Sequence, residues 1–98
     1  MRIITKKRIQ EFAEQHPNGD AAAREWFIKS KRADWNNLSE MKQMFNSVDY
    51  VGNDRYVFNL AGNNYRLIAI VRFRQKLIFI RFIGSHGEYD KIKDIKTI

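Results

Sequence analysis

The side chains best suited to chemistry in this chain gather within residues 66–89. His86 and Tyr89 follow a strand-like run that contains Arg81. Arg66 interrupts the run before it, which is otherwise apolar. Histidine titrates near neutral pH, and histidine and tyrosine both transfer protons, while arginine presents paired donors that fit phosphate oxygens. Together these residue types suit acid–base chemistry on a phosphodiester.

The spacing after the last strand-like run favours a short helical turn that groups three of these side chains. Ser85 and Glu88 form the pattern of a capping box, in which each residue hydrogen-bonds the backbone of the other. His86, Tyr89 and Asp90 then stand at positions i, i+3 and i+4, on one side of the turn. The same spacing also allows a plainer interpretation, in which Tyr89 packs on the sheet and His86 caps the turn or faces solvent.

The two arginines meet only if their strands pair in one register. The expected strands are residues 65–73 and 76–83. A two-residue or four-residue loop between them places Arg66 opposite Ile83 and Arg81 opposite Ile68. The arginines then lie diagonally on one face, about 7 Å apart at the backbone and within reach of one anion. A slip of one residue would put them on opposite faces.

The preceding hairpin adds an amide to this constellation. Its expected strands are residues 48–51 and 55–60. A turn within residues 61–64 places Asn59 opposite Arg66 on the same face, so an amide and two guanidinium groups converge there. The other face carries a continuous apolar set for helices to cover. This set is Phe58, Leu67, Ala69, Val71, Ile78, Ile80 and Phe82.

Three amphipathic segments in the first half of the chain predict helices. The first spans residues 6–15, with Thr5 as its N-cap, and the second follows a cap at Asp20. The second helix presents one face made of Ala22, Ala23, Trp26, Phe27, Ser30 and Ala33. A third, short helix follows Ser39, with the stripe Met41, Met44 and Phe45. Such stripes are more typical of core packing than of a partner site.

The order of these elements predicts the class of fold. Helices come first, an antiparallel meander follows, Gly84 ends its last strand, and a helical turn comes last. No repeat, low-complexity segment or linker divides the chain, and 44% of its residues are hydrophobic, which excludes general disorder. We expect one α+β domain over residues 1–98, with the N-terminal helices on one face of the sheet.

A surplus of positive charge indicates a polyanionic partner. The chain has 18 Lys and Arg against 11 Asp and Glu, a formal net charge of +7. Residues 63–83 hold five of these basic residues and no acidic one. Arg72, Arg74 and Lys76 flank the expected turn of this segment, where they either face solvent or bind RNA phosphates.

Several classes of chemistry are disfavoured by composition. With no cysteine, the chain has no disulfide, thiolate nucleophile or thiol-based zinc site. Two histidines and no clustered carboxylates offer no plausible ligand set, so we expect neither metal nor cofactor. No signal-peptide pattern or long uninterrupted apolar run is present, so we expect a soluble cytoplasmic protein without a membrane partner.

Two other functional classes remain open at this point. A small RNA- or DNA-binding module without catalysis needs only the basic face of the sheet, and it predicts binding without cleavage. An interaction protein would instead meet an acidic partner with its positive charge. Replacement of His86 separates the first of these from an enzyme, because a binding module does not need that imidazole.

Residues 35–91 resemble the HigB toxins of bacterial type II toxin–antitoxin modules. The resemblance is carried by three runs, FNLAGNNYRLIA at residues 58–69, IRF at residues 80–82 and HGEYDK at residues 86–91. Upstream, Leu38, Lys42, Phe45 and Asp49 also fit the pattern. The combination at these spacings is far more specific than any one element. Ser85 stands where the pattern often has threonine, which keeps a capping hydroxyl.

This resemblance implies a RelE-like fold and an mRNA interferase that cleaves messenger RNA, commonly at the ribosome. It implies metal-independent attack by the RNA 2′-hydroxyl, and silencing by a HigA-like helix-turn-helix antitoxin through which the complex binds its own operator DNA. The family's catalytic positions fall on Arg66, Arg81, His86 and Tyr89. Asn59 and Asn63 match supporting polar positions.

Overall fold

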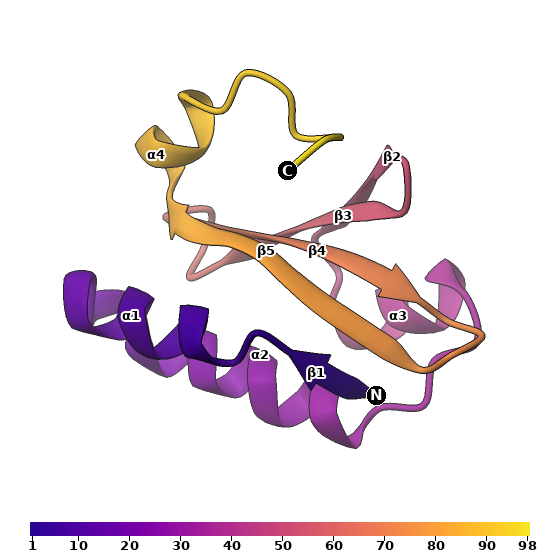
Figure 1. Ribbon diagram of the computed structural model, residues 1–98. Helices are drawn as coiled ribbons and strands as arrows, with labels where there is room; N and C mark the ends of the chain where they lie inside the picture. Colours follow the sequence, from indigo (N-terminus) through magenta and orange to yellow (C-terminus); the bar gives the residue numbers. More distant parts are fainter.

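The structure is a computed structural model that describes residues 1–98, and it contains a five-stranded sheet in the order β1-β5-β4-β3-β2. Along the chain the elements are β1 (Arg2–Ile4), α1 (Lys7–Gln15), the 3-10 turn η1 (Pro17–Gly19), α2 (Asp20–Arg32), α3 (Leu38–Met44), β2 (Val48–Gly52), β3 (Arg55–Leu60), β4 (Tyr65–Arg72), β5 (Leu77–Ser85) and α4 (His86–Asp90). Helices α1 and α2 lie along one face of the sheet, and α4 lies on the other side (Figure 1). The predicted α+β class is confirmed.

Strand β1 was not expected from the sequence. It pairs in parallel with β5, with Arg2 opposite Leu77, so the sheet is mixed rather than wholly antiparallel. Three residues are too few to show the alternation that identifies a strand. The pairing forms because α1 packs against β5 and brings the N-terminal segment alongside that strand.

The expected N-caps of the first two helices are wrong, and the third helix begins before Ser39 rather than after it. Thr5 has a φ of 71°, and its hydroxyl donates to a β5 carbonyl at 2.8 Å instead of capping α1. Asp20 is the first residue of α2, where its carboxylate pairs with Arg24 at 3.0 Å. The cap of α3 is Asn37, whose side-chain oxygen accepts a first-turn N–H at 2.9 Å. A cap needs extended backbone just before the helix, which residue type alone does not specify.

The core lies between the sheet and the helices. Six residues of the predicted apolar face are buried there, namely Phe58, Leu67, Ala69, Val71, Ile78 and Ile80. Trp26 of α2 meets Phe58 edge to face, with ring centroids 5.4 Å apart. Met41 of α3 is fully buried, whereas Met44 is exposed, so only part of that stripe packs in the core. Each fully buried large side chain contributes about 1.5–3 kcal/mol.

The register of β3 and β4 agrees with the prediction. Asn59 lies opposite Arg66, and the strands are joined by a four-residue turn over residues 61–64. Both side chains therefore belong to the sheet face that does not contact α1 and α2, which we call the outer face. A two-residue turn and a four-residue turn centred on residues 62 and 63 give the same pairing of β3 with β4. The prediction therefore did not depend on which of the two turns forms.

The register of β4 and β5 departs from the prediction halfway along the pair. Near the turn the pairing is as expected, with Ala69 opposite Ile80. The register then shifts by one residue, and Ile68 lies opposite Phe82, not Arg81. Arg81 has no partner in the ladder and forms a β-bulge, in which an extra residue kinks the strand and re-aims a side chain.

The bulge changes the faces and partners of the residues that follow it. Arg66 lies opposite Gly84 instead of Ile83. Phe82, expected in the core, belongs to the outer face. Gly84 does not end β5, which continues to Ser85. A Cβ at Gly84 would meet the Phe82 ring at 2.8 Å, so glycine here permits a close approach within the strand and does not break it.

No helix in the structure is both long enough and apolar enough to cross a bilayer.

Candidate active site

Helix α4 brings its side chains over the outer face at the end where β4 begins. It follows β5 directly, and the His86 N–H donates to the Asn64 carbonyl at 3.1 Å. Ser85 and Glu88 form both hydrogen bonds of the predicted capping box. The C-terminal segment then crosses toward the β2–β3 turn, where Asn53 donates to the Lys96 carbonyl at 2.9 Å. Figure 1 shows α4 and this segment above the sheet.

Arg66 and Tyr89 are in direct contact. The guanidinium carbon of Arg66 lies 4.5 Å from the centroid of the Tyr89 ring, which is a cation–π geometry. The same ring lies 6.5 Å from that of Phe82. Tyr89 therefore packs on the outer face of the sheet, and this packing holds the Arg66 guanidinium in place.

Two polar atoms at the base of this site are buried without a partner in the protein. They are Nε of Arg66 and the side-chain oxygen of Asn59. The other end of the Asn59 amide is fixed, because its Nδ2 donates to the Ser47 hydroxyl at 2.6 Å. An unpaired buried polar group costs about 1–3 kcal/mol. A bound anion would accept the hydrogen bond of the Arg66 Nε–H, whereas the Asn59 oxygen, an acceptor, would be satisfied by a hydroxyl group that donates to it.

His86 is paired with a carboxylate on its own helix. Its Nδ1 lies 3.0 Å from Oδ2 of Asp90, and its ring centroid lies 6.5 Å from that of Tyr89. These contacts confirm that His86, Tyr89 and Asp90 share one side of α4. The carboxylate orients the imidazole and leaves Nε2 free for proton transfer. The His86 side chain is 46% exposed, so a large substrate can reach it.

A second histidine, absent from the sequence-based site, ties α4 to the helical layer. Nε2 of His16 lies 2.8 Å from Oε1 of Glu88, and that oxygen also accepts the Ser85 N–H at 2.8 Å. The backbone hydrogen bond from Ser85, with a smaller contribution from His16, lowers the pKa of Glu88. The His16 ring packs on Phe12 and Tyr65, with centroids 5.1 and 5.6 Å away. Only the folded chain brings residues 72 positions apart into contact, so no local pattern identified this pair.

The remaining predicted site residues lie at both ends of β4 and β5 and midway along β5. Asn63 is exposed in the β3–β4 turn, at the same end as α4. Arg81 is exposed on the bulge of β5. Arg72 and Arg74 lie at the opposite end, about 20 Å along the strand from Arg66. The structure thus brings Asn59, Arg66, His86 and Tyr89 together and leaves the basic turn apart from them.

Lys76, also predicted to bind RNA, is held by contacts within the protein. Its ammonium lies 2.9 Å from the Asp34 carboxylate and donates to the Trp35 carbonyl at 2.9 Å and to Asn36 at 3.0 Å. The hydrogen bond from Lys76 lowers the pKa of Asp34. This ammonium anchors the loop between α2 and α3 to the β4–β5 turn.

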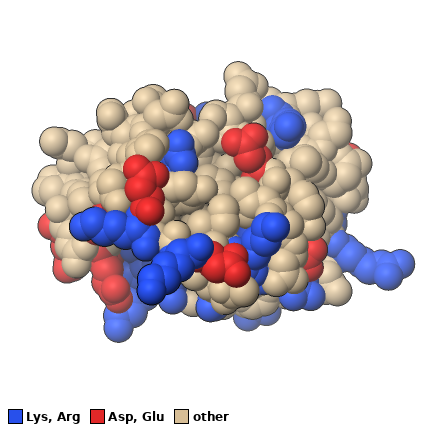
Figure 2. Space-filling view, turned by 90° about the horizontal axis from the view of Figure 1, so that it is seen from above, with Lys and Arg blue, Asp and Glu red and all other residues tan.

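The charge on the outer side does not form one continuous patch. Figure 2 looks down on this side and shows separate Lys and Arg groups, with acidic groups among them and most of the basic ones toward its lower edge. The local arrangement of Arg66 with its neighbours therefore carries more information than the net charge.

Comparison with known proteins gives a consistent result. Residues 20–92 match a family model described as "HigB_toxin, RelE-like toxic component of a toxin-antitoxin system". The chain is 35% identical over 94 residues to a protein of Escherichia coli O6:H1 named mRNA interferase HigB, covering 94% of this chain and 91% of that protein. It is 32% identical over 101 residues to a Shigella flexneri protein of the same name, with 92% and 88% covered.

Proposed function

Because the chain belongs to the HigB family of RelE-like toxins of toxin–antitoxin systems, we propose that it is an mRNA interferase, an endoribonuclease that cleaves messenger RNA and so stops translation and growth. The observation that carries the proposal is the cluster of Arg66, Tyr89 and His86 on the outer face. It combines a buried guanidinium nitrogen that lacks a partner with an accessible, carboxylate-paired imidazole.

The reaction that fits these side chains is attack by the RNA 2′-hydroxyl on the adjacent phosphorus. A base removes the hydroxyl proton, the new O–P bond forms, and the bond to the 5′-oxygen breaks. The leaving oxygen receives a proton, and the products carry a 2′,3′-cyclic phosphate and a 5′-hydroxyl. Every step uses only proton transfer and charge stabilisation.

In this scheme each residue of the cluster has a distinct role. His86 accepts the 2′-hydroxyl proton at Nε2, while Asp90 holds Nδ1. Tyr89 supplies a proton to the leaving oxygen. Arg66, oriented by the Tyr89 ring, stabilises charge on the non-bridging oxygens. A preorganised donor of this kind is worth about 3–4 kcal/mol in the barrier.

Other residues bind the RNA chain around the reacting phosphate. Arg81, on the exposed bulge, contacts the same or a neighbouring phosphate, and Asn59 and Asn63 position the nucleotide. Arg72 and Arg74 bind backbone phosphates farther along the strand. Lys76 supports that end indirectly, because its ammonium is paired with Asp34 and holds the loop between α2 and α3 on the β4–β5 turn.

The proposal extends to the setting in which the enzyme acts. We infer that it works in the cytoplasm on mRNA bound to ribosomes and is silenced by a HigA-like antitoxin, whose helix-turn-helix domain carries the complex to its operator DNA. The description of the family as the toxic component of a two-part system supports the antitoxin.

The test is to induce the chain alone in bacterial cells and to map transcript 5′ ends. We expect growth arrest and new 5′ ends within coding regions, and neither effect with His86→Gln or Arg66→Ala. Arg32→Ala, which removes an exposed arginine of α2 far from the site, is the matched control and stays toxic. Growth arrest with intact transcripts would refute cleavage of mRNA, and undiminished cleavage by His86→Gln would remove that residue from the mechanism.

A further inference from the structure

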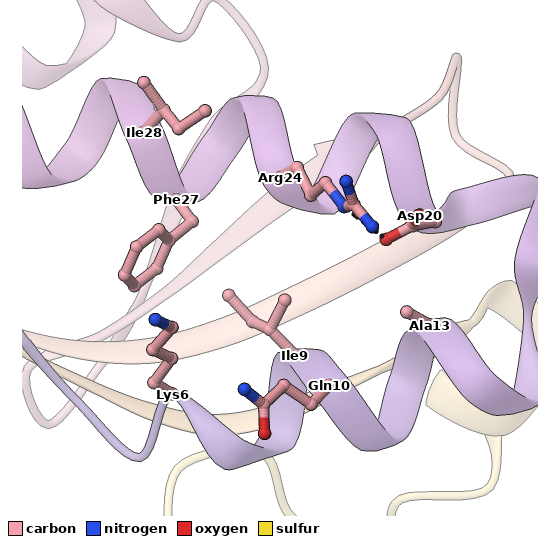
Figure 3. A pocket seen from close by; sticks show the side chains of 8 residues that line it. All are labelled: Lys6, Ile9, Gln10, Ala13, Asp20, Arg24, Phe27 and Ile28. Atoms are coloured by element: carbon pink, nitrogen blue, oxygen red, sulfur yellow. Dashed lines mark hydrogen bonds and ion pairs between the residues drawn. The ribbon is translucent and has the colours of Figure 1, made fainter.

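The helical layer contains a groove on the side that faces away from the sheet. It runs between α1 and α2 and encloses about 440 Å³. Figure 3 shows Ile9 and Phe27 pointing toward one another across it, with Ala13 farther along α1 and Ile28 on the rim formed by α2. A second hollow of about 240 Å³ shares Lys6 and Phe27 and extends the groove toward Arg2 and Lys31. The combined groove follows most of the length of α2.

The apolar part of this groove is open to solvent. Ile28 is 48% exposed, although a large aliphatic side chain on a helix surface is normally placed against another element. Phe27 is only half-buried, and the Lys6 ammonium lies over its ring, 5.1 Å from the centroid. No other segment of the chain covers these side chains.

The rim of the groove is positively charged. Arg2, Lys6, Arg24 and Lys31 line the two hollows, against Asp20 as the one carboxylate. That carboxylate is already paired with Arg24 at 3.0 Å. The rim therefore has three basic side chains that no acidic lining residue balances. An occupant that matches the groove has an apolar stripe with acidic residues on its flanks.

An amphipathic helix fits these features better than RNA does. Helices dock through an apolar face in a groove between helices, with anchors at i, i+3, i+4 and i+7. A helix of ten to twelve residues, about 15–18 Å long, matches the length of the groove. RNA binds through cations together with open aromatic surfaces on which its bases stack. Here the cations lie on the rim, the floor is mainly aliphatic and the one aromatic ring lies under Lys6, so an apolar stripe with acidic flanks fits the groove better.

We propose that the α1–α2 groove docks an acidic amphipathic helix of the antitoxin. This inference rests on the proposed function, because it takes the partner from the toxin–antitoxin system. Helices α1 and α2, which line the groove, lie on the opposite side of the sheet from α4 (Figure 1). The docked helix therefore anchors the antitoxin without touching Arg66, Tyr89 or His86, and toxicity and neutralisation depend on separate surfaces.

Charge-reversed and polar variants of the groove test this separation. Ile28→Glu places a carboxylate on the apolar rim, and Arg24→Glu reverses a rim charge; both side chains are exposed, so the fold tolerates them. Each variant is induced in cells with and without the antitoxin expressed from the reading frame beside the gene. We expect both variants to arrest growth alone, as the parent does, and to escape neutralisation. Lys29→Glu, an exposed change on α2 outside the groove, is the matched control and stays neutralised.

Binding is measured separately from toxicity by titrating purified toxin with the purified antitoxin. We expect the affinity to fall at least tenfold for Ile28→Glu and Arg24→Glu, and to stay unchanged for Lys29→Glu.

Unchanged affinity and normal neutralisation of both groove variants would overturn the docking proposal while leaving the nuclease proposal intact. If the parent chain binds the antitoxin through this groove but cleaves no RNA, the proposed activity fails and the docking surface stands. Weakened RNA binding by Ile28→Glu, with antitoxin binding unchanged, would assign the groove to RNA instead.

Discussion

Single side chains in the site carry polar atoms that the protein itself leaves unpaired. Arg66 Nε and the Asn59 oxygen are buried and face no protein partner, while Nδ1 of His86 is already bound to Asp90. The Arg66 Nε–H is a preorganised donor, which needs no reorientation when charge develops in the transition state, and the Asn59 oxygen is a preorganised acceptor. Their unpaired state slightly destabilises the free protein.

The imidazole of His86 offers the most direct test of one side chain. We expect His86→Gln to lower the rate of RNA cleavage by about 10²- to 10⁴-fold, the usual contribution of a positioned acid or base. The side chain is half exposed, so the melting temperature should stay within the error of the parent's. Single-turnover cleavage and thermal unfolding measure the two effects. A large drop in melting temperature would show that the residue is structural.

Tyr89 has two functions that substitution can separate. Tyr89→Phe keeps the ring that supports Arg66 but removes the hydroxyl, whereas Tyr89→Ala removes both. We expect the Tyr89→Phe variant to cleave RNA more slowly with unchanged RNA affinity. We expect the Tyr89→Ala variant both to cleave more slowly and to bind RNA more weakly. Measured Kd and single-turnover rates separate these effects. Equal behaviour of the two variants in both assays would contradict a role for the ring in orienting Arg66.

Among the helices and strands, α4 depends on contacts that titrate with acid. The Ser85 N–H and, less strongly, His16 lower the pKa of Glu88 in the folded protein, so Glu88 holds α4 most firmly above the ordinary pKa of glutamate. That stabilisation falls as pH drops through the lowered pKa. We expect the amide protons of Glu88 and Lys91, which donate to the Ser85 hydroxyl and the Glu88 carbonyl, to lose protection from exchange in that acid range, before the core strands do.

Glu88→Gln is the control for this pH dependence. It removes the charge, so α4 should exchange faster than in the parent at neutral pH and show no further loss on acidification through that range. The exchange rates of the α4 amide protons are measured by NMR in both proteins at the same pH values. If the two proteins show the same protection of α4 at neutral pH, Glu88 does not anchor this helix.

Local patterns predicted most of the elements because hydrophobic period and turn length determine them. The Asn59 and Arg66 pair was predicted because a short turn fixes the register of β3 and β4. The bulge at Arg81 was not predicted. The sequence of β5 does not alternate regularly between apolar and polar residues, so the one-residue shift in the alternation that a bulge causes cannot be recognised in it. Strand β1 and the His16–Glu88 contact depend on packing between distant segments, which spacing along the chain does not encode.

Across the molecule as a whole, basic residues that are close together in the sequence lie apart in the folded protein. The five basic residues of the segment 63–83 end up in separate places. Arg66 lies at the end of β4 nearer α4, and Arg81 lies midway along β5. Arg72 and Arg74 lie at the far turn, and Lys76 is paired with Asp34. Net charge thus favours a polyanionic partner in general, while the geometry singles out one site.

The basic turn makes a prediction about RNA affinity rather than catalysis. We expect the double variant Arg72→Ala and Arg74→Ala to bind RNA more weakly in low salt. The logarithm of the RNA association constant decreases linearly with the logarithm of the salt concentration. We expect this slope to become less steep by about 0.7 for each phosphate that the variant no longer neutralises. The rate of cleavage of bound RNA should be unchanged. Fluorescence anisotropy over a salt series measures the slope, and an unaltered slope would show that both arginines are merely solvated.

The chemistry of the RNA ends decides whether the 2′-hydroxyl is the nucleophile. An mRNA is translated in vitro with the purified protein, and the fragments are analysed for their terminal groups. We expect a 2′,3′-cyclic phosphate on the upstream fragment, a 5′-hydroxyl on the downstream fragment, and no cleavage where a 2′-deoxynucleotide precedes the cut. Fragments that end in a 3′-hydroxyl and a 5′-phosphate, or cleavage that persists without the 2′-hydroxyl, would contradict the proposed reaction.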